Sequence, residues 1–402
     1  MAQDTGARDV AIAGIGATPY YRRGETAGQS ITQLAGEAIL AACADAGLSV
    51  TEVDGLAFYS LARAGYGEQM EAGELVETLG IRELKFSAAL TGGGGGSAGA
   101  IGLARAAIVA GDASVVVTVM ALQQRTRLGT VVASKTVTPI SSFVQPSGLA
   151  GPGHLMSLLT RRHMHQYGTT RDAFAEIAIS TRRNALSRPK ARYRQPLTRE
   201  QYFSARMIAD PLCLYDFCLE SEGAVAIVTT SIERARDLRQ PPVPVLAAAH
   251  GGTREWGRAF SWFGMPDEVF ASAGNKPIAD RLYTRAGVRA QDIDVALIYD
   301  HFTPMVLMQL EDYGFCEKGE GGPFVLSGAI RYTPERKPGA VPVNTHGGQL
   351  SEAYVIGATH IVEGVEQLRG TAVNQVAGAE LALVTGGPSA IPNSGLILGR
   401  DR

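Results

Sequence analysis

The stretch AGLSVTEVDGLAFY at residues 46–59 decides the fold, because it returns without a gap as AGVRAQDIDVALIY at residues 286–299. Each copy is typical of a helix that ends near a glycine, followed by a turn and a buried strand. A second pair follows in the same order: residues 109–118 read VAGDASVVVT, and residues 376–385 read VAGAELALVT. Together the two pairs predict two homologous halves.

Helical segments alternate with short apolar strands in both halves, which predicts an α/β fold. We place the N-terminal half at residues 1–232 and the C-terminal half at residues 243–402, with an Arg- and Pro-rich linker from Glu233 to Pro244. The N-terminal half is the longer one. Its excess, at about residues 122–210, predicts an inserted, mostly helical region.

The composition excludes several classes of protein. The chain has 402 residues and a net charge of -2, from 37 Lys and Arg against 39 Asp and Glu, which argues against a nucleic-acid binder. It has no apolar run long enough to span a membrane and no signal-peptide core at its polar start. Four scattered cysteines do not predict a disulfide framework or a metal site. We therefore expect a cytoplasmic protein without a membrane segment.

A run of glycines, Gly92–Gly96, precedes Ser97 and a helical stretch at about Ala100–Ala110. A glycine turn that opens a helix presents backbone N–H groups, which suit an anion or a developing oxyanion. It is not a nucleotide-binding loop of the Walker type, because no Lys-Ser/Thr follows. The alternative is close backbone packing. Gly94, Gly95 and Ser97 are our substrate-binding candidates.

Tyr299, Asp300 and His301 follow the predicted strand Val295–Ile298. Polar residues at the carboxyl end of a buried strand are good site candidates in α/β proteins. A tyrosine there can transfer protons if its neighbours shift its pKa. The alternative is a buried tyrosine whose hydroxyl is simply satisfied.

A second polar glycine turn, Asn344–Gly348, precedes Tyr354 and a predicted helix that reaches about Leu368. Tyr354 would fall in the first turn of that helix, where the helix dipole favours a phenolate, although it could equally pack on a buried face. His346 is a base or a residue that stabilises the turn. A third loop, Thr385–Pro388, offers backbone donors. The supporting candidates are Asp300, His301, Asn344, His346, Gly386 and Gly387.

Two further groups have an ordinary and a functional interpretation. The arginines of the inserted region are either a solvated face or a phosphate-binding surface for a nucleotide-bearing substrate; they are Arg161, Arg162, Arg182, Arg183, Arg192 and Arg194. Cys316 is either a small buried hydrophobic residue or a nucleophile.

The duplicated halves, the glycine-rich helix starts and the turn at residues 344–348 resemble the thiolase superfamily. Residues 302–322 and 363–370 are most similar to its sterol-carrier-protein-type and lipid-transfer-protein branch. The resemblance spans nearly the whole chain. It implies a thiolase fold with five layers, αβαβα, a homodimer, and an inserted region that covers coenzyme A.

The same resemblance implies which catalytic positions have changed. The nucleophilic cysteine of thiolases falls at about Gly94, and the second cysteine at Val384. The Asn or His at the strand end becomes Tyr299, and the His after the glycine turn becomes Tyr354. Without a thiol there is no acyl-enzyme. Gly94 in place of cysteine would also leave room for a branched acyl chain.

The two tyrosines at these positions resemble the steroid side-chain-cleaving retro-aldolases of the superfamily, which implies a carbon–carbon lyase. Two catalytic tyrosines would cleave a β-hydroxyacyl-CoA, a steroid side-chain thioester with a 17-hydroxyl, to a ketone and propionyl-CoA. No cofactor is implied beyond the coenzyme A of the substrate. The implied partner is a small acyl-CoA-associated protein with an OB-fold and a zinc ribbon. The sequence leaves open which tyrosine is the base. It also leaves open a silent acyl-CoA-binding or scaffold subunit, and a thiolase that uses Cys316.

Overall fold

The computed structural model describes residues 10–59, 70–90, 94–124, 142, 145–149, 151–252, 270–388 and 392–401. The strands of the N-terminal half are β1 Val10–Ala17, β2 Tyr21–Arg22, β3 Gly55–Tyr59, β4 Phe86–Leu90, β5 Val115–Leu122, β6 Met207–Ala209, β7 Leu212–Cys213 and β8 Ser221–Ser231. Its helices are α1 Ile31–Ala46, α2 Ala72–Leu79, α3 Gly96–Ala110, α5 Pro152–Tyr167, α6 Arg171–Ala185, α7 Arg199–Phe203 and α8 Ile232–Arg236.

The C-terminal half has fewer elements. Its strands are β9 Val243–Gly251, β10 Val295–Leu297, β11 Leu381–Gly386 and β12 Asn393–Gly399. Its helices are α10 Lys276–Ala286, α11 Thr303–Asp312, α12 Gly321–Leu326 and α13 Ala358–Arg369. A π-helical turn, Gly348–Glu352, precedes α13.

The strand order is the same in the two halves. The main sheet runs β10-β11-β12-β9-β1-β8-β5-β3-β4, with β2 beside β8. β3 and β10 pair in parallel with β5 and β11, and these pair antiparallel with β8 and β12. The halves meet where β1 pairs briefly with β9. Each of these C-terminal strands thus has an N-terminal counterpart, which confirms the predicted duplication.

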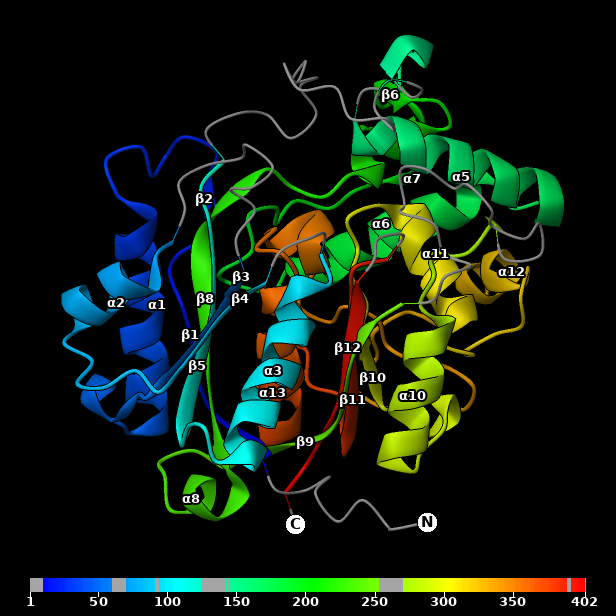
Figure 1. Cartoon of the computed structure of the whole chain (residues 1–402). Helices are drawn as coiled ribbons and strands as arrows, with labels where there is room; N and C mark the ends of the chain where they lie inside the picture. The colour runs from blue at the N-terminus through cyan, green and yellow to red at the C-terminus, as the bar shows by residue number, and fades with distance from the viewer. Residues whose placement is uncertain are drawn as a thin grey trace.

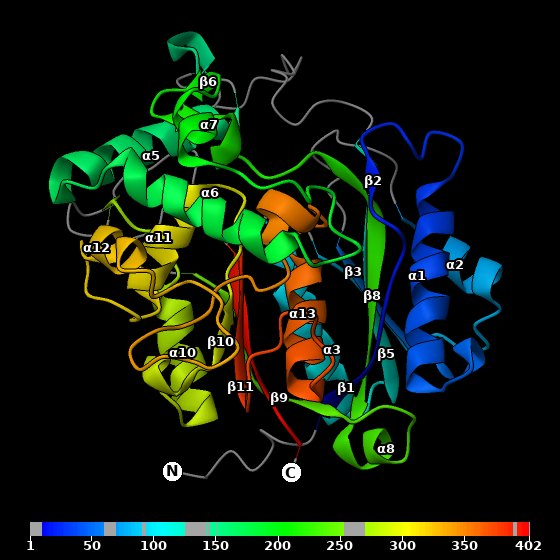
Figure 2. The same ribbon diagram turned by 180° about the vertical axis from the view of Figure 1, so that it is seen from behind.

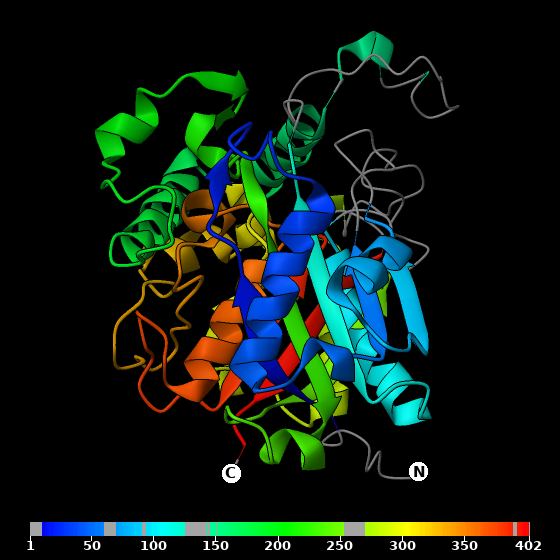
Figure 3. The ribbon, with the colours of Figure 1, turned by 90° about the vertical axis from the view of Figure 1, so that its left-hand side faces the viewer.

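The elements form five layers, as predicted (Figures 1 and 2). Helices α3 and α13 lie between the two half-sheets and contact strands of both. Helix α1 packs on the outer face of β1 and β8, where Figure 3 looks onto it from outside (blue). Helix α10 packs on β9 and β12 at the opposite face. Side chains from the central helices and both half-sheets share one apolar core.

Residues at matching positions of the repeat make the same structural contacts in each half. Gly47 ends α1 and Gly287 ends α10, both with positive φ (77° and 67°), a conformation that glycine adopts without a steric penalty. Asp54, before β3, accepts hydrogen bonds from the backbone N–H groups of Ser114 and Val115, where β5 begins (2.9 and 2.8 Å). Asp294, before β10, does the same for β11 (2.8 and 3.0 Å). The sequence repeat therefore marks where neighbouring strands are joined.

The inserted region lies between β5 and β8 and is mostly helical in its described part, as predicted. Helix α6 packs against α11, α12 and the π-helical turn. Residues 125–141, 143–144 and 150 of the insert lie outside the described residues. The predicted linker begins with α8 and runs into β9, and the boundaries of the halves at residues 232 and 243 stay a prediction. None of the described helices is both long and apolar enough to cross a bilayer.

Candidate active site

Two tyrosine hydroxyls meet between the half-sheets. Tyr299 follows β10, and Tyr354 lies between the π-helical turn and α13. The Tyr299 hydroxyl donates a long hydrogen bond of 3.4 Å to the Tyr354 hydroxyl oxygen. The two residues are only 2% and 8% exposed. The structure thus brings together the two tyrosines that the sequence placed on separate loops.

The backbone of Tyr299 is held on both sides. Its N–H donates to the hydroxyl of Thr385 at the end of β11 (2.9 Å), and its carbonyl accepts from the side-chain amide of Gln309 on α11 (2.9 Å). The Thr385 hydroxyl also donates to Gln309 (2.6 Å). Gln309 was not predicted from the sequence, and the loop at Thr385 was expected to offer mainly backbone donors. A polar residue at a buried helix position is the signal that could have revealed Gln309.

Tyr299 is a neutral phenol. Burial raises its pKa well above the usual value of 10, and the neighbouring Tyr354, which accepts its proton in the hydrogen bond, raises it further. Smaller contributions come from the nearby Tyr59 and Cys218. Tyr299 therefore keeps its proton at neutral pH.

The first glycine turn packs directly on Tyr299. A Cβ at Gly94 would lie 2.2 Å from Cζ of Tyr299 and 2.4 Å from its hydroxyl oxygen. The expectation that Gly94 leaves room for an acyl chain is therefore wrong, since the phenol ring of Tyr299 fills that space. Gly92 and Gly93 lie outside the described residues.

The remaining glycines of this region also make close backbone contacts. A Cβ at Gly95 would lie 1.9 Å from the carbonyl oxygen of Pro392, and one at Gly387 would lie 2.5 Å from the backbone N of Gly95. A Cβ at Gly386 would lie 2.6 Å from Oγ of Ser394. Close packing thus explains why these residues are glycines. That their backbone N–H groups donate to an oxyanion stays a prediction.

Ser97 lies beside the tyrosines in the first turn of α3, which begins earlier than predicted, at Gly96. The residue is fully buried, and its hydroxyl has no hydrogen-bond partner among the described residues. A Cβ at Gly357 would lie 3.2 Å from that hydroxyl and 2.7 Å from Cδ2 of Tyr299. The Ser97 hydroxyl therefore adjoins the Tyr299 ring.

Tyr354 does not lie in a helix, contrary to the prediction, because α13 begins only at Ala358. Positive φ angles at Ile356 (53°) and Gly357 (78°) interrupt the helical path. The backbone of Tyr354 is instead held by Ser221, whose Oγ accepts from its N–H (2.7 Å) and donates to its carbonyl (3.0 Å). The argument from a helix dipole does not apply to Tyr354.

Asp300 shapes the segment that leads to Tyr354. Its carboxylate accepts the backbone N–H groups of Gln349 (2.8 Å) and Leu350 (3.2 Å). Nε2 of His360 lies 3.1 Å from the same carboxylate. Asp300 is fully buried and stabilises the π-helical turn through these backbone hydrogen bonds.

Asn344 fastens the second glycine turn to β10. Its side chain accepts from the N–H of Ile298 (2.7 Å) and donates to the carbonyl of the same residue (2.8 Å). These bonds continue the strand edge up to Tyr299. Asn344 itself has a positive φ of 47°, a conformation that asparagine tolerates better than most residues.

The two predicted histidines are uncharged. His301 packs its ring 5.3 Å from that of Tyr299, and burial lowers its pKa to about 3. His346 is buried against His360, and burial lowers its pKa well below 6.5. His301 therefore borders the tyrosine pair, while His346 belongs to the packing under the turn.

Arginines of the insert hold the Tyr354 segment. Arg188 is buried (4% exposed) and pairs with Glu352 at 2.8 Å, Glu363 at 3.3 Å and Glu366 at 2.5 Å. Arg182, expected on a solvated or phosphate-binding face, is buried and donates to the Ser351 hydroxyl (2.8 Å). The sequence analysis passed over Arg188, because nothing local distinguishes a buried arginine from an exposed one.

Family models match most of the chain. The model for the N-terminal domain of thiolase matches residues 10–226, and the model for a thiolase C-terminal domain-like region matches residues 262–400. The chain belongs to the thiolase family.

Among thiolase-family relatives, the chain is 41% identical to a 17-hydroxy-3-oxo-4-pregnene-20-carboxyl-CoA lyase of Mycobacterium tuberculosis, over 97% of this chain and 98% of the relative. It is 39% identical to a steroid side-chain-cleaving aldolase of Thermomonospora curvata, over 98% of both. The solved Ltp2-ChsH2(DUF35) aldolase superposes with a TM-score of 0.87 at 38% identity, over 98% of both chains. The predicted likeness to the steroid side-chain-cleaving aldolases is confirmed.

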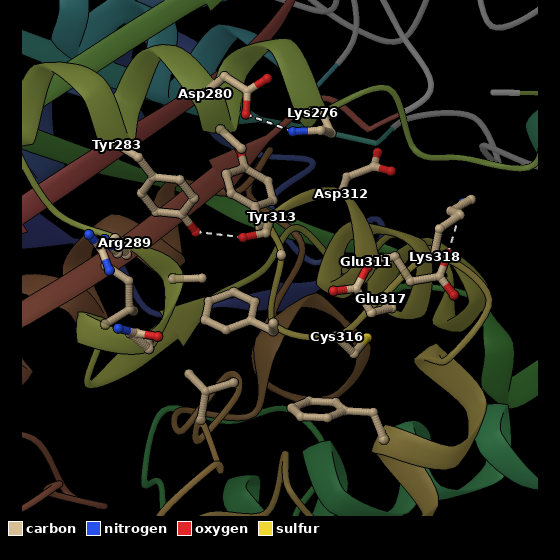
Figure 4. A pocket seen from close by; sticks show the side chains of 18 of the residues that line it. Lys276, Asp280, Tyr283, Arg289, Glu311, Asp312, Tyr313, Cys316, Glu317 and Lys318 are labelled. Carbon is tan, nitrogen blue, oxygen red and sulfur yellow. Dashed lines mark hydrogen bonds and ion pairs between the residues drawn. The ribbon is translucent and has the colours of Figure 1, made fainter. Parts of the chain in front are cut away.

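Cys316 lies apart from the tyrosines. It lines a groove of about 960 Å³ formed by α10, α11 and the segment after α11, and neither Tyr299 nor Tyr354 lines this groove (Figure 4). Burial and the nearby Glu311 raise the pKa of its thiol to about 12. A thiolate is thus scarce at Cys316, and its environment does not favour a nucleophile.

Proposed function

We propose that this thiolase-family protein is a retro-aldolase. It cleaves a β-hydroxyacyl-CoA thioester, a steroid side chain with a 17-hydroxyl, to a ketone and propionyl-CoA. The activities named for its relatives support this proposal. The observation that carries it is the buried contact of 3.4 Å between the hydroxyls of Tyr299 and Tyr354.

The reaction balances with proton transfers alone. One tyrosinate removes the proton of the β-hydroxyl, and a carbonyl forms as the bond between the α- and β-carbons breaks. The electron pair of that bond passes to the thioester as an enolate. The other tyrosine then protonates the α-carbon, which leaves a ketone and a shorter acyl-CoA. Water and free coenzyme A are not consumed, and the contact between the hydroxyls can return the proton afterwards.

The geometry supports one assignment of roles. Tyr299 keeps its proton and donates the hydrogen bond to Tyr354, which supports Tyr299 as the acid and Tyr354 as the base. The Tyr299 hydroxyl also lies where a side chain at Gly94 would project, and the thiolase nucleophile falls at this position by resemblance. That nucleophile attacks the thioester carbon, which is next to the α-carbon that needs the proton. Tyr299 is therefore well placed to protonate it.

A thiolase mechanism is less well supported by the thiols present. Cys218 lies near enough to Tyr299 to influence its pKa. Burial and the nearby Asp300 raise the pKa of the Cys218 thiol itself. A buried thiol with a raised pKa is a poor nucleophile.

The proposal includes partners. The solved relative is an aldolase complex whose name contains a DUF35 component, which supports a small acyl-CoA-associated partner with an OB-fold and a zinc ribbon. We also propose a homodimer, and coenzyme A only as part of the substrate, without a resident cofactor.

The test is mass spectrometry of products from a 17-hydroxy steroid side-chain CoA thioester, with and without that partner subunit. We expect a 17-ketone and propionyl-CoA in equal amounts. Tyr299→Phe and Tyr354→Phe should each lower turnover by about two to four orders of magnitude. The control is Tyr283→Phe, since among the described residues that hydroxyl donates to the carbonyl of Tyr313 alone (2.8 Å), away from the tyrosine pair. Intact substrate in every reaction, despite measurable binding, would contradict the proposal and favour a silent subunit.

A further inference from the structure

A third tyrosine lies beside the pair. Tyr59 is the last residue of β3, and in the repeated halves it occupies the position that Tyr299 occupies after β10. Its side chain is fully buried in the same core as Tyr299 and Tyr354. The sequence analysis quoted Tyr59 only as part of the repeat. The duplication itself is the signal that could have found it.

Tyr59 and Tyr299 contact the same glycine turn. A Cβ at Gly96 would lie 2.1 Å from Cδ2 of Tyr59, just as one at Gly94 would lie 2.2 Å from Cζ of Tyr299. The rings thus pack on glycines two residues apart, at the start of α3. Tyr59 is also close enough to contribute to the raised pKa of Tyr299.

The hydroxyl of Tyr59 has no hydrogen-bond partner among the described residues. A buried polar group without a partner costs free energy, and nothing in the described fold offsets that cost here. The phenolic proton of Tyr59 stays in place at neutral pH, because burial raises its pKa above 10. Tyr59 therefore offers a permanent, unused hydrogen-bond donor beside Tyr299.

We propose that the Tyr59 hydroxyl donates a hydrogen bond to the thioester oxygen of the substrate and stabilises the enolate that forms there. The inference rests on the retro-aldolase activity proposed above. If Tyr299 protonates the α-carbon, the thioester oxygen is two bonds from that carbon, and Tyr59 packs on the same glycine turn as Tyr299. The free hydroxyl of Ser97 and the N-terminus of α3 lie at the same turn and favour negative charge there. No bond to Tyr59 forms or breaks, since it acts only as a donor.

The test compares Tyr59→Phe with Tyr313→Phe in three measurements. Tyr313 is equally buried (1% exposed) but packs near the outer helices, with its hydroxyl beside Gly395. The first measurement is cleavage of the steroid thioester. The second is exchange of the α-protons of propionyl-CoA in D₂O, which requires enolate formation but no carbon–carbon cleavage. The third is binding of propionyl-CoA against propyl-CoA, a thioether that lacks the carbonyl oxygen.

We expect Tyr59→Phe to slow both cleavage and exchange by about 10²-fold, as for the loss of one oxyanion donor. It should weaken binding of propionyl-CoA but not of propyl-CoA. Its Tm should equal or exceed that of the wild type, since only an unpaired hydroxyl is lost. Tyr313→Phe should leave both rates within twofold.

Three results would overturn the inference. Cleavage and exchange within twofold of wild type would show that the hydroxyl is not used. A marked fall in Tm or a failure to fold would show that it has a structural partner instead. Equal losses of affinity for the two ligands would show that it does not contact the carbonyl oxygen. If the wild type itself neither cleaves the thioester nor exchanges the α-protons, the proposed function fails first and the inference falls with it.

Discussion

Two glycine turns lead into the two central helices, and they deliver their residues to the site in different ways. In the N-terminal half, Gly94 and Gly95 run directly into α3 and are packed against other groups. In the C-terminal half, the turn at residues 344–348 is followed by a π-helical turn and five further residues before α13 begins. Tyr354 lies in that interval. The regular turn packs against the Tyr299 ring, and the irregular one carries Tyr354, the base in the proposed reaction.

The irregular segment persists because other parts of the chain hold it. Asp300 accepts two of its backbone N–H groups, Ser221 bonds both backbone groups of Tyr354, and Arg188 pairs with Glu352. These three residues are far apart in the sequence. An unusual backbone survives only where surrounding contacts determine it.

The largest effect is expected from Arg188→Met, which removes the arginine that holds the irregular C-terminal segment. Two of its three partners, Glu352 and Glu363, are fully buried and would lose their cation. We expect a loss of about 3–5 kcal/mol in the free energy of unfolding, measured by denaturant titration. Arg331→Met is the control, because its pair with Glu176 is partly exposed and should contribute below about 1 kcal/mol. Equal effects of the two changes would show that Arg188 does not hold the Tyr354 segment.

The regular turn can be tested with Gly94→Ala. The new methyl group would collide with the Tyr299 ring, and a displacement of about 1 Å in a reacting group can cost about 10² in rate. We expect turnover to fall by about that factor while the protein stays folded. Gly102→Ala in α3 is the control, since among the described residues its Cβ would approach Ala248 alone, at 3.4 Å. Full activity of Gly94→Ala would mean that the position of the Tyr299 ring is not critical.

The carboxyl group of Glu352, the partner of Arg188, predicts how the free energy of unfolding depends on pH. Burial raises the pKa of Glu352 to about 7, with Arg188 opposing the shift and Glu363 and Glu366 adding to it. The folded protein therefore holds a proton that the unfolded chain releases near pH 4.5, and Glu352 destabilises the fold as the pH rises from about 4.5 to 7.

Glu352→Gln should remove this dependence. We expect the wild type to lose about 2 kcal/mol more than the variant between pH 5 and pH 7.5, by chemical denaturation at each pH. Glu176→Gln, which changes a partly exposed pair, should follow the wild type. Parallel pH curves for wild type and Glu352→Gln would place the titration elsewhere.

The smallest effect is expected for Cys316→Ser. The thiol lies in the groove between α10 and α11 and not with the tyrosines, so turnover should stay within twofold of wild type. Rapid alkylation of Cys316 by iodoacetamide with loss of activity would instead support the thiolase alternative. Taken with the tyrosine variants, this result separates the two chemistries.

The predictions from the sequence succeeded where a local pattern has a local cause. The helix-ending glycines Gly47 and Gly287 have the expected positive φ, and the matched aspartates Asp54 and Asp294 precede matched strands. The helix at Tyr354 was predicted wrongly, since a glycine turn before an apolar stretch usually opens a helix. There, contacts from Asp300 and distant residues outweigh the local preference.

The sequence by itself determined the duplicated α/β fold, the family and the pair of tyrosines, because repeats and motifs are carried by neighbouring residues. Only the tertiary structure decided that the Tyr299 ring fills the space at Gly94, that Arg188 holds the Tyr354 segment, and that Tyr59 packs in the same core as the tyrosine pair. The physical reason is that burial and hydrogen bonding depend on residues brought together from distant parts of the chain. The sequence alone does not distinguish a tyrosine that packs in a core from one that contacts a substrate, because the surrounding residues decide between the two.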